Sequence, residues 1–411
     1  MSTKPFVAQW GILGCGWISS EFVKDACRPM SSRSVTDVSH AIVAVGSRDD
    51  GLIDFAPEAC GSYKAVVDHP NVNIVYVGTM NVSHYEDAKL ALEGGKHCLL
   101  EKPATLNAAE WKHLVSIAQA KKVFLMEAVW TRFNPCMLAV QKAVFDGEIG
   151  DVRCVYSDLS MDAFGKRPDS HRVLSAELAG GALLDLGPYP MVWSLMILYR
   201  HPRNNMSPPE NIGSTMLRHQ QTGVDLATNW GMPFPKINAM AFCSATLLNE
   251  TPGENVTRIV GSAGTTSSTT LLHTERSRER GKRPAALILC VSEIIVQGMT
   301  SRPLKYIVRK LVNPEKEDRV FHADEVHDHT FDGFGLYWEA DAVARCLRGE
   351  RPAFKVIGVE KTRRPGLKSA DGLLECPEMT HAETSLAMEI FDKIRKDGGY
   401  KYVDGLEKVK A

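Results

Sequence analysis

Two distant stretches of the chain carry side chains that could exchange a proton with a bound molecule. Lys102 stands between Glu101 and Pro103, and the proline restricts the backbone of Lys102 to an extended form. Asp185 and Tyr189 are four residues apart in the second stretch. Because a free tyrosine titrates near ~10, Tyr189 needs a nearby cation to act as a base, and we expect Lys102 to supply it. The alternatives are an ion pair between Lys102 and Glu101 and a core tyrosine bonded to Asp185.

A glycine turn near the N-terminus could hold a phosphate group. The run from Val7 to Leu13 is apolar enough for a buried strand, and Gly14 and Gly16 follow it directly. Gly14 permits a tight turn, and Gly16 lets the backbone approach a diphosphate closely. A helix that begins near Ile18, after Trp17, would add free N–H groups and the positive end of its dipole. The alternative is the ordinary strand–turn–helix corner of any α/β domain.

The elements that would position these residues alternate between strand and helix in the first third of the chain. We predict strands over 39–46, 72–77, 96–100 and 122–127, and helices over 83–93 and 107–120. Apolar strands separated by helices indicate a parallel sheet covered on both faces, and ligands gather at the carboxyl ends of such strands. The residues at those ends, which we expect to meet in one crevice, are Gly14, Ser47, Thr79, Glu101 and Glu127.

The pattern changes after Trp130, where strands follow one another without intervening helices. This order indicates a mainly antiparallel sheet that can leave one face open. The predicted strands are 152–159, 237–248, 257–261, 286–297 and 304–312, and the predicted helices are 135–145, 187–199, 334–347 and 381–395. With 411 residues the chain is long enough for two domains, and its fold class is α/β.

Charge and composition argue against nucleic acid and membranes as partners. The 48 Lys and Arg residues nearly cancel the 49 Asp and Glu residues, so no overall field attracts a polyanion. The basic stretch 274–284 contains two glutamates and no aromatic residue, which favours a solvated hairpin loop. We find no apolar run near the ~18–20 residues of a membrane span.

Cysteine and histidine spacing gives no sign of a disulfide framework or a metal site. The ten cysteines are scattered singly, a pattern typical of a reducing compartment. The chain enters its first strand at once, with no room for a signal peptide, so we expect a cytoplasmic protein. The stretch 322–329 holds metal-capable side chains without a recognised ligand spacing, and we predict no metal.

Ser47 and Arg48 bear on the choice of cofactor, because they follow a strand whose end faces the adenine ribose in a dinucleotide fold. A carboxylate there would accept the 2′-hydroxyl of NAD, whereas an arginine can pair with the 2′-phosphate of NADP. Arg48 after a small hydroxyl residue favours NADP, and Asp49 and Asp50 leave NAD as the alternative.

Four motifs occur in the order and approximate spacing of one enzyme family. They are the glycine turn, the stretch from Thr79 to His84, the tripeptide at 101–103, and the segment from Gly180 to Tyr189. On these residues the chain resembles the glucose–fructose oxidoreductase / inositol dehydrogenase / MocA family over nearly its whole length. Longer matches are most similar to the branch of fungal NADP-dependent D-xylose 1-dehydrogenases and dimeric dihydrodiol dehydrogenases. They include 126–133, 169–172, 303–306 and 337–341.

The resemblance implies a Rossmann NADP-binding domain over 1–130 and an α/β domain for substrate binding and oligomerisation over 131–411. The large, mainly antiparallel open sheet of the second domain commonly forms a dimer interface in the family. The implied catalytic residues are Lys102, Tyr189 and Asp185. The implied cofactor-binding residues are Gly14, Gly16, Trp17, Ile18, Ser47, Arg48, Thr79, Asn81, His84, Glu101, Lys102, Trp130 and Arg132. The implied substrate-binding residues are Trp130, Phe133, His171, Arg172, Asp185 and Tyr189.

We therefore expect hydride transfer between NADP and a carbinol carbon of a sugar or vicinal diol, with a homodimer formed through the second sheet. Met80 replaces a proline usual in relatives, Asn81 stands where close relatives often have histidine, and 361–377 reads as an insertion. These departures weaken xylose itself as the substrate. A fungal secondary metabolite, a non-catalytic NADP-binding regulator and a scaffold protein remain the alternatives.

Overall fold

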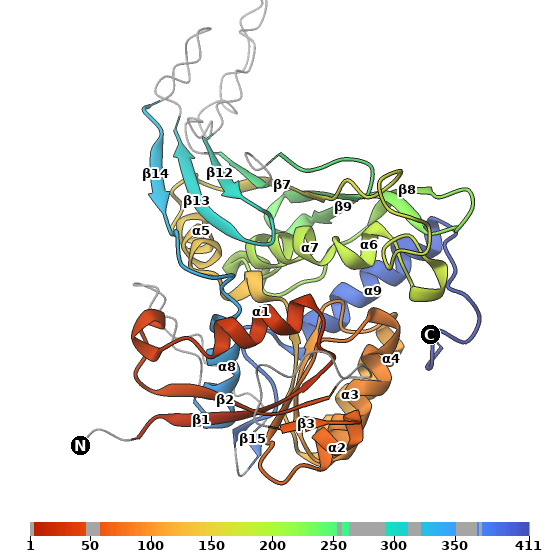
Figure 1. Cartoon of the computed structure of the whole chain (residues 1–411). Helices are drawn as coiled ribbons and strands as arrows, with labels where there is room; N and C mark the ends of the chain where they lie inside the picture. Colours follow the sequence, from red (N-terminus) through yellow and green to blue (C-terminus); the bar gives the residue numbers. More distant parts are fainter. Residues whose placement is uncertain are drawn as a thin grey trace, which may run out of the picture.

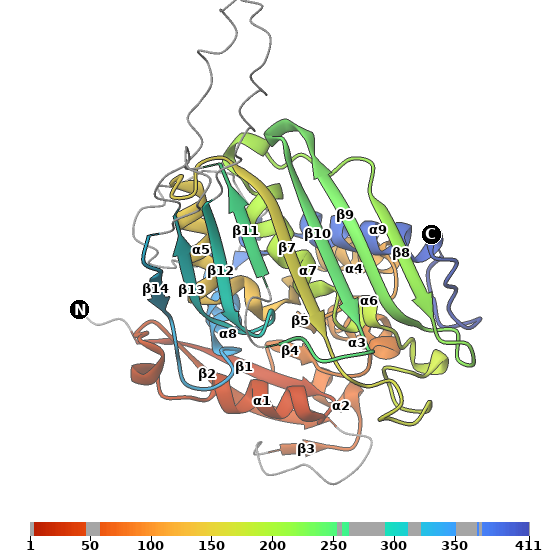
Figure 2. The same cartoon turned by 90° about the horizontal axis from the view of Figure 1, so that it is seen from above.

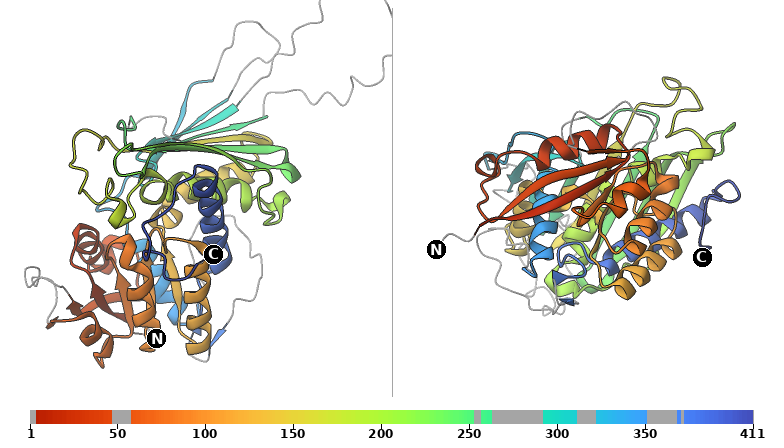
Figure 3. Two further views of the ribbon diagram at one scale, coloured as in Figure 1. Left: turned by 90° about the vertical axis from the view of Figure 1, so that its right-hand side faces the viewer. Right: turned by 60° about the horizontal axis from the view of Figure 1, so that its bottom comes forward.

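The computed structural model describes residues 4–46, 58–252, 257–262, 292–310, 322–350, 368–369 and 372–410. These residues form two large sheets with helices packed between and around them (Figure 1). The smaller sheet and its helices make the lower half of the view, and the larger sheet covers the top. The layers are seen edge-on in Figure 3, left.

The smaller sheet is parallel throughout and has the strand order β3-β2-β1-β4-β5-β6 among the described residues. Its strands are β1 (Phe6–Leu13), β2 (Val38–Gly46), β3 (Glu58–Cys60), β4 (Ile74–Val77), β5 (His97–Glu101) and β6 (Leu125–Ala128). The crossover helices are α1 (Trp17–Ala26), α2 (Tyr63–Asp68), α3 (His84–Glu93) and α4 (Ala108–Lys121). This order confirms the predicted parallel sheet.

Hydrophobic residues cover both faces of this sheet, as its apolar strands require. Trp10 and Ile12 of β1 belong to one core cluster, with Phe22 of α1, while Leu13 belongs to the other, with Trp111 of α4. Successive side chains of a strand point to opposite faces, so one strand contributes to both clusters. The carboxyl ends of the strands remain free to form a site.

Strand β6 begins later than we predicted. We expected a strand from residue 122, but Lys122 takes the left-handed conformation that ends α4, with a φ of 57°. The N–H of Phe124 then donates to Nδ1 of His97 at 2.9 Å instead of joining the sheet. The regular pairing with β5 therefore starts at Leu125.

The larger sheet has the order β14-β13-β12-β11-β7-β10-β9-β8 among the described residues. All neighbouring pairs are antiparallel except β7 with β10, which confirms a mainly antiparallel sheet. Figure 2 shows the strands side by side in this order. They are β7 (Val152–Ser160), β8 (Gly213–Arg218), β9 (Asp225–Phe234), β10 (Ala239–Thr246), β11 (Thr257–Gly261), β12 (Ser292–Gly298), β13 (Pro303–Arg309) and β14 (Glu325–Asp328).

Helices cover only one face of this sheet within the part of the chain that the structure describes. They are α5 (Pro135–Phe145), α6 (Ala182–Asp185) and α7 (Pro188–Ser194), which lie below the sheet in Figure 1. Along β10, buried Ala241, Cys243 and Ala245 alternate with more exposed Phe242 and Ser244. This alternation is typical of an antiparallel sheet with one packed and one open face.

The C-terminal helices pack on the first sheet. The predicted domain boundary at residues 130 and 131 had assigned them to the second domain. Helix α8 (Tyr337–Leu347) packs against α1, β1 and β2, and α9 (His381–Asp397) packs against α4 and β6. Figure 3, right, shows α8 beside β1 and β2. The N-terminal sheet therefore obtains part of its cover from the far end of the chain.

Two expectations from the sequence lie outside the site. We found no apolar run near the length of a membrane span, but the helical segment Ala176–Tyr199 is long and apolar enough by composition, which corrects that reading. Its most apolar window is wholly buried within the protein. The stretch 322–329 contributes β14, and Tyr306 of β13 stacks on His327 with ring centroids 4.3 Å apart. No cluster of metal-ligating side chains occurs among the residues that the structure describes.

Candidate active site

A cavity of about 520 Å³ lies at the carboxyl ends of β1, β4 and β5, where the parallel sheet was expected to gather a ligand. Residues from the loop before α6, and from α6 and α7, close its other side. The lining residues are Gly14, Cys15, Gly16, Trp17, Ile18, Tyr63, Gly78, Thr79, Met80, Asn81, His84, Glu101, Lys102, Arg172, Leu178, Asp185 and Tyr189.

The glycine turn leaves room for a diphosphate at the start of α1. Gly14 has a φ of +84°, and a Cβ there would lie 2.9 Å from Cγ2 of Thr79. Gly16 precedes α1, and no atom lies within 4 Å of the Cβ it lacks. The turn thus presents open backbone at the positive end of a helix, so the residues present fit a dinucleotide phosphate.

Lys102 contacts Asp185 across the cavity, and not the side chain of Glu101. Its Nζ donates to the carbonyl oxygen of Asp185 at 2.8 Å and lies 3.5 Å from Oδ1 of the same residue. Glu101 instead accepts the backbone N–H of Lys102 at 3.1 Å and the hydroxyl of Tyr76 at 2.7 Å. Lys102 therefore does not form the ion pair with Glu101 that the sequence left as an alternative.

Asp185 is shared by two cations. Nη1 of Arg172 donates at 2.8 Å to its Oδ1, the same oxygen that lies 3.5 Å from Nζ of Lys102. Burial opposes ionisation of Asp185, but Lys102 and Arg172 outweigh it and lower the pKa of Asp185 to about 2. The carboxylate is thus ionised at neutral pH and holds both cations in place.

Tyr189 meets Lys102 inside the same cavity. Nζ of Lys102 lies 5.2 Å from the centre of the Tyr189 ring, and the tyrosine hydroxyl accepts the indole N–H of Trp130 at 3.1 Å. Burial raises the pKa of Tyr189 above its usual value, although Lys102 acts to lower it. Our expectation of a net lowered pKa is wrong for this state, because desolvation of the phenolate outweighs one ammonium.

His84 ties two strand ends together beside Lys102. Its ring nitrogens lie 2.7 Å from the carbonyl oxygen of Pro103 and 3.1 Å from that of Thr79. Pro103 directly follows Lys102, and Thr79 lies just after β4. The imidazole therefore connects two segments whose residues line the cavity. Burial lowers the pKa of His84 to about 4.

Several predicted residues lie away from the cavity wall. Trp130 reaches the site through its bond to Tyr189, while Phe133 is fully buried in the core. His171 neighbours Arg172 but is not among the described residues that line the cavity. Glu127 is buried and accepts the N–H of Ala104 at 3.0 Å. Ser47 and Arg48, and the stretch 274–284, fall outside the described residues, as does most of 361–377.

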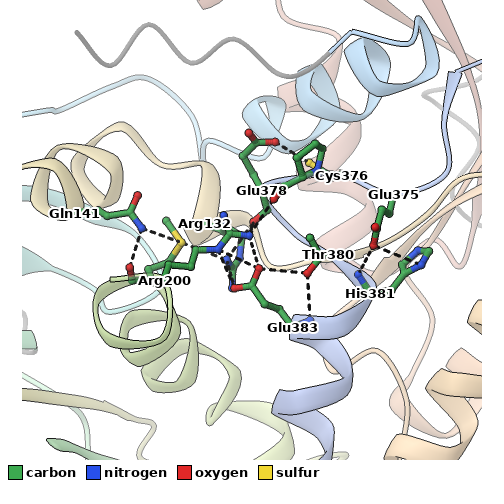
Figure 4. A network of polar contacts seen from close by, with 11 residues as sticks. Arg132, Gln141, Arg200, Glu375, Cys376, Glu378, Thr380, His381 and Glu383 are labelled. Carbon is green, nitrogen blue, oxygen red and sulfur yellow. Dashed lines mark hydrogen bonds and ion pairs between the residues drawn. The ribbon is translucent and has the colours of Figure 1, made fainter. Parts of the chain in front are cut away.

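Arg132 was expected to bind the cofactor, but the structure buries it in a separate ion network (Figure 4). Its Nη1 donates to Oε1 of Glu383 at 3.0 Å and to the carbonyl of Glu378 at 3.1 Å. Nε of Arg200 donates to the same Glu383 carboxylate at 2.9 Å. Arg132 therefore fastens α9 to the turn that follows β6, and its guanidinium is engaged away from the cavity.

Sequence reasoning missed other residues at the site. Cys15, Tyr63, Gly78, Met80 and Leu178 line the cavity. Cys15 and Met80 lie within motifs that we identified, so they could have been predicted from the sequence. Tyr63 and Leu178 come from segments in which no motif indicates a site.

An aromatic run borders the mouth of the cavity. Trp17 is 65% exposed, and its ring centroid lies 5.3 Å from that of Phe334. Phe334 in turn lies 6.1 Å from Trp130, which bonds to Tyr189. Phe334 comes from the segment before α8, about 150 residues beyond the other site residues, so no sequence pattern could place it here.

The arrangement can move a proton to or from an oxygen of a bound molecule. A phenol and an ammonium meet in the cavity, a carboxylate holds the ammonium, and a glycine turn can hold a phosphate beside them. This combination suits the interconversion of a hydroxyl and a carbonyl next to a dinucleotide.

Comparisons with known proteins agree with this description. Residues 8–129 match the family model described as "Oxidoreductase family, NAD-binding Rossmann fold", and residues 137–267 match "GFO/IDH/MocA C-terminal domain". The D-xylose 1-dehydrogenase (NADP(+)) of Hypocrea jecorina is 35% identical, over 98% of this chain and 94% of that protein. The trans-1,2-dihydrobenzene-1,2-diol dehydrogenase of Macaca fascicularis is 31% identical, over 96% of this chain and 98% of that protein.

Solved structures share the fold at lower sequence identity. KijD10, a 3-ketoreductase from Actinomadura kijaniata crystallised with NADP and TDP-benzene, has a TM-score of 0.68 at 18% identity. The alignment covers 95% of this chain and 97% of that chain. An aldose-aldose oxidoreductase from Caulobacter crescentus has a TM-score of 0.65 at 17% identity, with the same coverage.

Proposed function

Because the chain belongs to the GFO/IDH/MocA family of oxidoreductases, we propose that it is an NADP-dependent dehydrogenase or reductase acting on a CH–OH group. The substrate is a sugar or a vicinal diol, the two classes named for the relatives. The observation that carries the proposal is the meeting of Lys102, Asp185 and Tyr189 in the cavity beside the glycine turn.

Each residue of the site has its own role in the proposed reaction. NADP, when bound, supplies the nicotinamide that exchanges a hydride with the substrate carbon. Tyr189 takes the proton from the substrate hydroxyl in oxidation and returns it to the carbonyl oxygen in reduction. Lys102 stabilises negative charge on the phenol and substrate oxygens, and Asp185 keeps its ammonium in the cavity. Gly14, Gly16 and the start of α1 would hold the diphosphate.

Removing the phenol hydroxyl tests the assignment. We expect Tyr189→Phe to lower kcat by roughly 10²–10⁴-fold, because a positioned acid/base contributes that much. Lys102→Met should lower kcat at least as far. NADPH affinity, measured by fluorescence titration, should stay nearly unchanged for Tyr189→Phe, since the hydroxyl faces Trp130 and not the glycine turn.

The control is Tyr63→Phe, which removes the hydroxyl of another tyrosine of the cavity wall and should leave kcat nearly unchanged. Near-normal turnover of Tyr189→Phe and Lys102→Met, with sugars and diols as substrates, would overturn the catalytic roles. NADPH binding without turnover of any substrate by the wild type would favour the regulator. A fungal secondary metabolite remains the second candidate, because Met80 and Asn81 of the cavity depart from the family pattern.

We further propose that the protein is a homodimer formed through the open face of the larger sheet. Tyr156 and Phe242 are 37% and 39% exposed on neighbouring strands of this face, and their rings stack at 5.0 Å. The guanidinium of Arg258 lies 4.9 Å from the Tyr156 ring. Exposed aromatic side chains with an arginine are the residue types that protein interfaces favour.

We also propose a cytoplasmic location. The structure shows no disulfide among the nine cysteines in the described part of the chain, and five of them are buried. Free thiols persist in a reducing compartment.

A further inference from the structure

Lys102 is held by the backbone of α6 as well as by a side chain. Its Nζ donates to the carbonyl oxygen of Asp185, the last residue of that helix, at 2.8 Å. The carboxylate of Asp185 lies 3.5 Å from the same nitrogen. A shift of α6 would therefore move both oxygens that hold the ammonium. Because a single turn of helix is not stable by itself, contacts from outside must fix the position of α6.

One such contact comes from a buried carboxylate at the start of β9. Asp225 is 1% exposed, and its Oδ2 accepts the N–H of Leu183 at 2.7 Å and the hydroxyl of Thr228 at 2.9 Å. Leu183 is the second residue of α6, so its N–H has no carbonyl partner within the helix. A carboxylate is a stronger acceptor for such an N–H than a neutral group. Asp225 is not among the described residues that line the cavity.

Asp225 is charged when it makes these contacts at neutral pH. Burial raises the pKa of Asp225 to about 6, and the hydrogen bonds that it accepts oppose that rise. Its charge in turn raises the pKa values of Tyr400 and Tyr402, which follow α9. The hydroxyl of Tyr400 donates to the carbonyl of Gly180 at 3.0 Å, just before α6. Two segments that are distant in sequence thus fasten the beginning of this helix.

We propose that Asp225 is a positioning residue, which fixes the first residues of α6 and thereby sets where the carbonyl and the carboxylate of Asp185 meet Lys102. Leu183, whose N–H Asp225 accepts, and Asp185, whose carbonyl Lys102 contacts, are two residues apart. That separation is about 3 Å along a helix axis, so a displacement at one residue reaches the other. The inference rests on the proposed function only for what Lys102 does in the reaction.

The contact between Lys102 and Asp185 can be measured without a substrate. Fluorodinitrobenzene labels the free amine of a lysine, so the pH dependence of the labelling rate gives the pKa of that lysine. We expect the pKa of Lys102 to fall by about one pH unit in Asp225→Ala, and also in Asp185→Asn, because an adjacent anion stabilises an ammonium by that much or more. The charged and titratable groups that act on Lys102 are Tyr189, Asp185, Glu101 and Arg172.

Two controls separate this effect from a general loosening of the protein. Easier access of the reagent would raise the labelling rate at every pH and would leave the pKa of Lys102 in place. Lys96 should keep its pKa, since its Nζ donates to carbonyl oxygens in the segment before β4. Asp392→Ala removes another carboxylate that caps a helix, because Oδ2 of Asp392 accepts the N–H of Ala108 in α4 at 2.9 Å. It should leave the pKa of Lys102 unchanged.

Activity provides a second measurement. Asp225→Ala should lower kcat by roughly 10²-fold, since a misplacement of ~1 Å can cost that much. The Kd of NADPH should stay nearly unchanged, because the glycine turn belongs to the other sheet. Asp225→Asn keeps one acceptor oxygen and loses the charge, so its kcat and its pKa for Lys102 should lie between those of Asp225→Ala and the wild type.

An unchanged pKa of Lys102 in Asp225→Ala would overturn the proposal. If that variant does not fold, Asp225→Asn decides the question, and wild-type values of both kcat and the pKa of Lys102 in it would refute the proposal. The labelling requires no substrate and no cofactor. A wild type that turns over no sugar or diol would therefore contradict the proposed function, while the role of Asp225 would still be decided by the pKa of Lys102.

Discussion

Asp185 shows how strongly the fold sets the chemistry of one side chain. Burial alone would favour its neutral form, yet the two cations beside it lower its pKa to about 2. Lys102 has a pKa raised above its ordinary value, because Tyr189 and Asp185 together outweigh the effect of burial. At neutral pH the site therefore holds a fixed ion pair next to a neutral phenol, ready for proton exchange.

Glu127 provides a prediction at the scale of a single residue. Burial raises the pKa of Glu127 to about 7, against ~4.3 for a free glutamate. Between these values the folded state binds more protons than the unfolded state, so stability falls as pH rises and stays lower above about 7. We expect Glu127→Gln to raise the free energy of unfolding at pH 8 by up to about 3 kcal/mol, with little change at about pH 4. Urea unfolding at both pH values measures this.

Glu383 is the matched control, because it is equally buried but has the opposite shift. Burial opposes its charge, yet Arg132 and Arg200 lower the pKa of Glu383 to about 2. Glu383→Gln leaves the buried Arg132 and the partly buried Arg200 without their anion and should destabilise the protein by about 3–5 kcal/mol at pH 8. Destabilisation at pH 8 by Glu127→Gln as well would contradict the account of Glu127.

At the scale of elements, the short helix α6 depends on a glycine that precedes it. Gly181 has a φ of +127°, and a Cβ there would collide with Oδ1 of Asp225. The other oxygen of that carboxylate accepts the N–H of Leu183 in α6 at 2.7 Å and the hydroxyl of Thr228 at 2.9 Å. The element that ends in Asp185 is thus held by a contact that only glycine permits.

We therefore expect Gly181→Ala to destabilise the protein by more than the ~1–3 kcal/mol of backbone strain alone, because the new Cβ must also displace Asp225. Loss of activity should accompany it, since Asp185 moves with α6. Thermal unfolding and kcat measure the two effects. Gly223→Ala is the control, because Gly223 has a φ of +76° with no atom within 4 Å of the absent Cβ. Equal losses in both variants would rule out the collision.

At the scale of the whole molecule, the site depends on parts of the chain that are far apart in sequence. Lys102 comes from the parallel sheet, Asp185 and Tyr189 from helices under the antiparallel sheet, and Phe334 from the segment before α8. The network of Arg132, Arg200 and Glu383 joins the two layers through α9 (Figure 4). Cavity shape is consequently a property of both layers together.

The proposed dimer gives a prediction at this scale. Phe242→Arg would place a charge in the aromatic patch of the open sheet face, beside Tyr156 and Arg258. We expect sedimentation equilibrium to show two chains for the wild type and one for the variant, with NADPH affinity retained, because the patch lies on the face opposite the helices that close the cavity.

Phe164→Arg is the control for that experiment. Phe164 is 45% exposed, lies beyond the end of β7, and contacts His219, which is not part of the aromatic patch. The Phe164→Arg variant should have the same oligomeric state as the wild type. A wild type that sediments as a single chain, or a Phe242→Arg variant that stays dimeric, would contradict the proposal.

Local patterns in the sequence determined the elements and the chemical types at the site. Apolar runs predicted the strands that became β1, β2, β4, β5 and β7, and cap residues placed α3, α4, α5 and α9 within a few residues of their observed ends. Strand β9 was missed because Asn229, Gly231 and Pro233 interrupt its apolar alternation. Strand β8 was missed because it is short and largely exposed. The motif residues Gly14, Lys102, Asp185 and Tyr189 all reached the cavity.

Only the tertiary structure decided which charged side chains pair and where the C-terminal helices pack. The contacts concerned join residues about 80 to 330 positions apart in the sequence. They are the pair of Lys102 and Asp185, the pair of Arg132 and Glu383, and the packing of α8 and α9 on the first sheet. Spacing in a sequence reports neighbours within one helix or strand, and it does not say which side chains of different elements pair. Burial, which reversed the expected pKa shift of Tyr189, likewise exists only once the layers have packed.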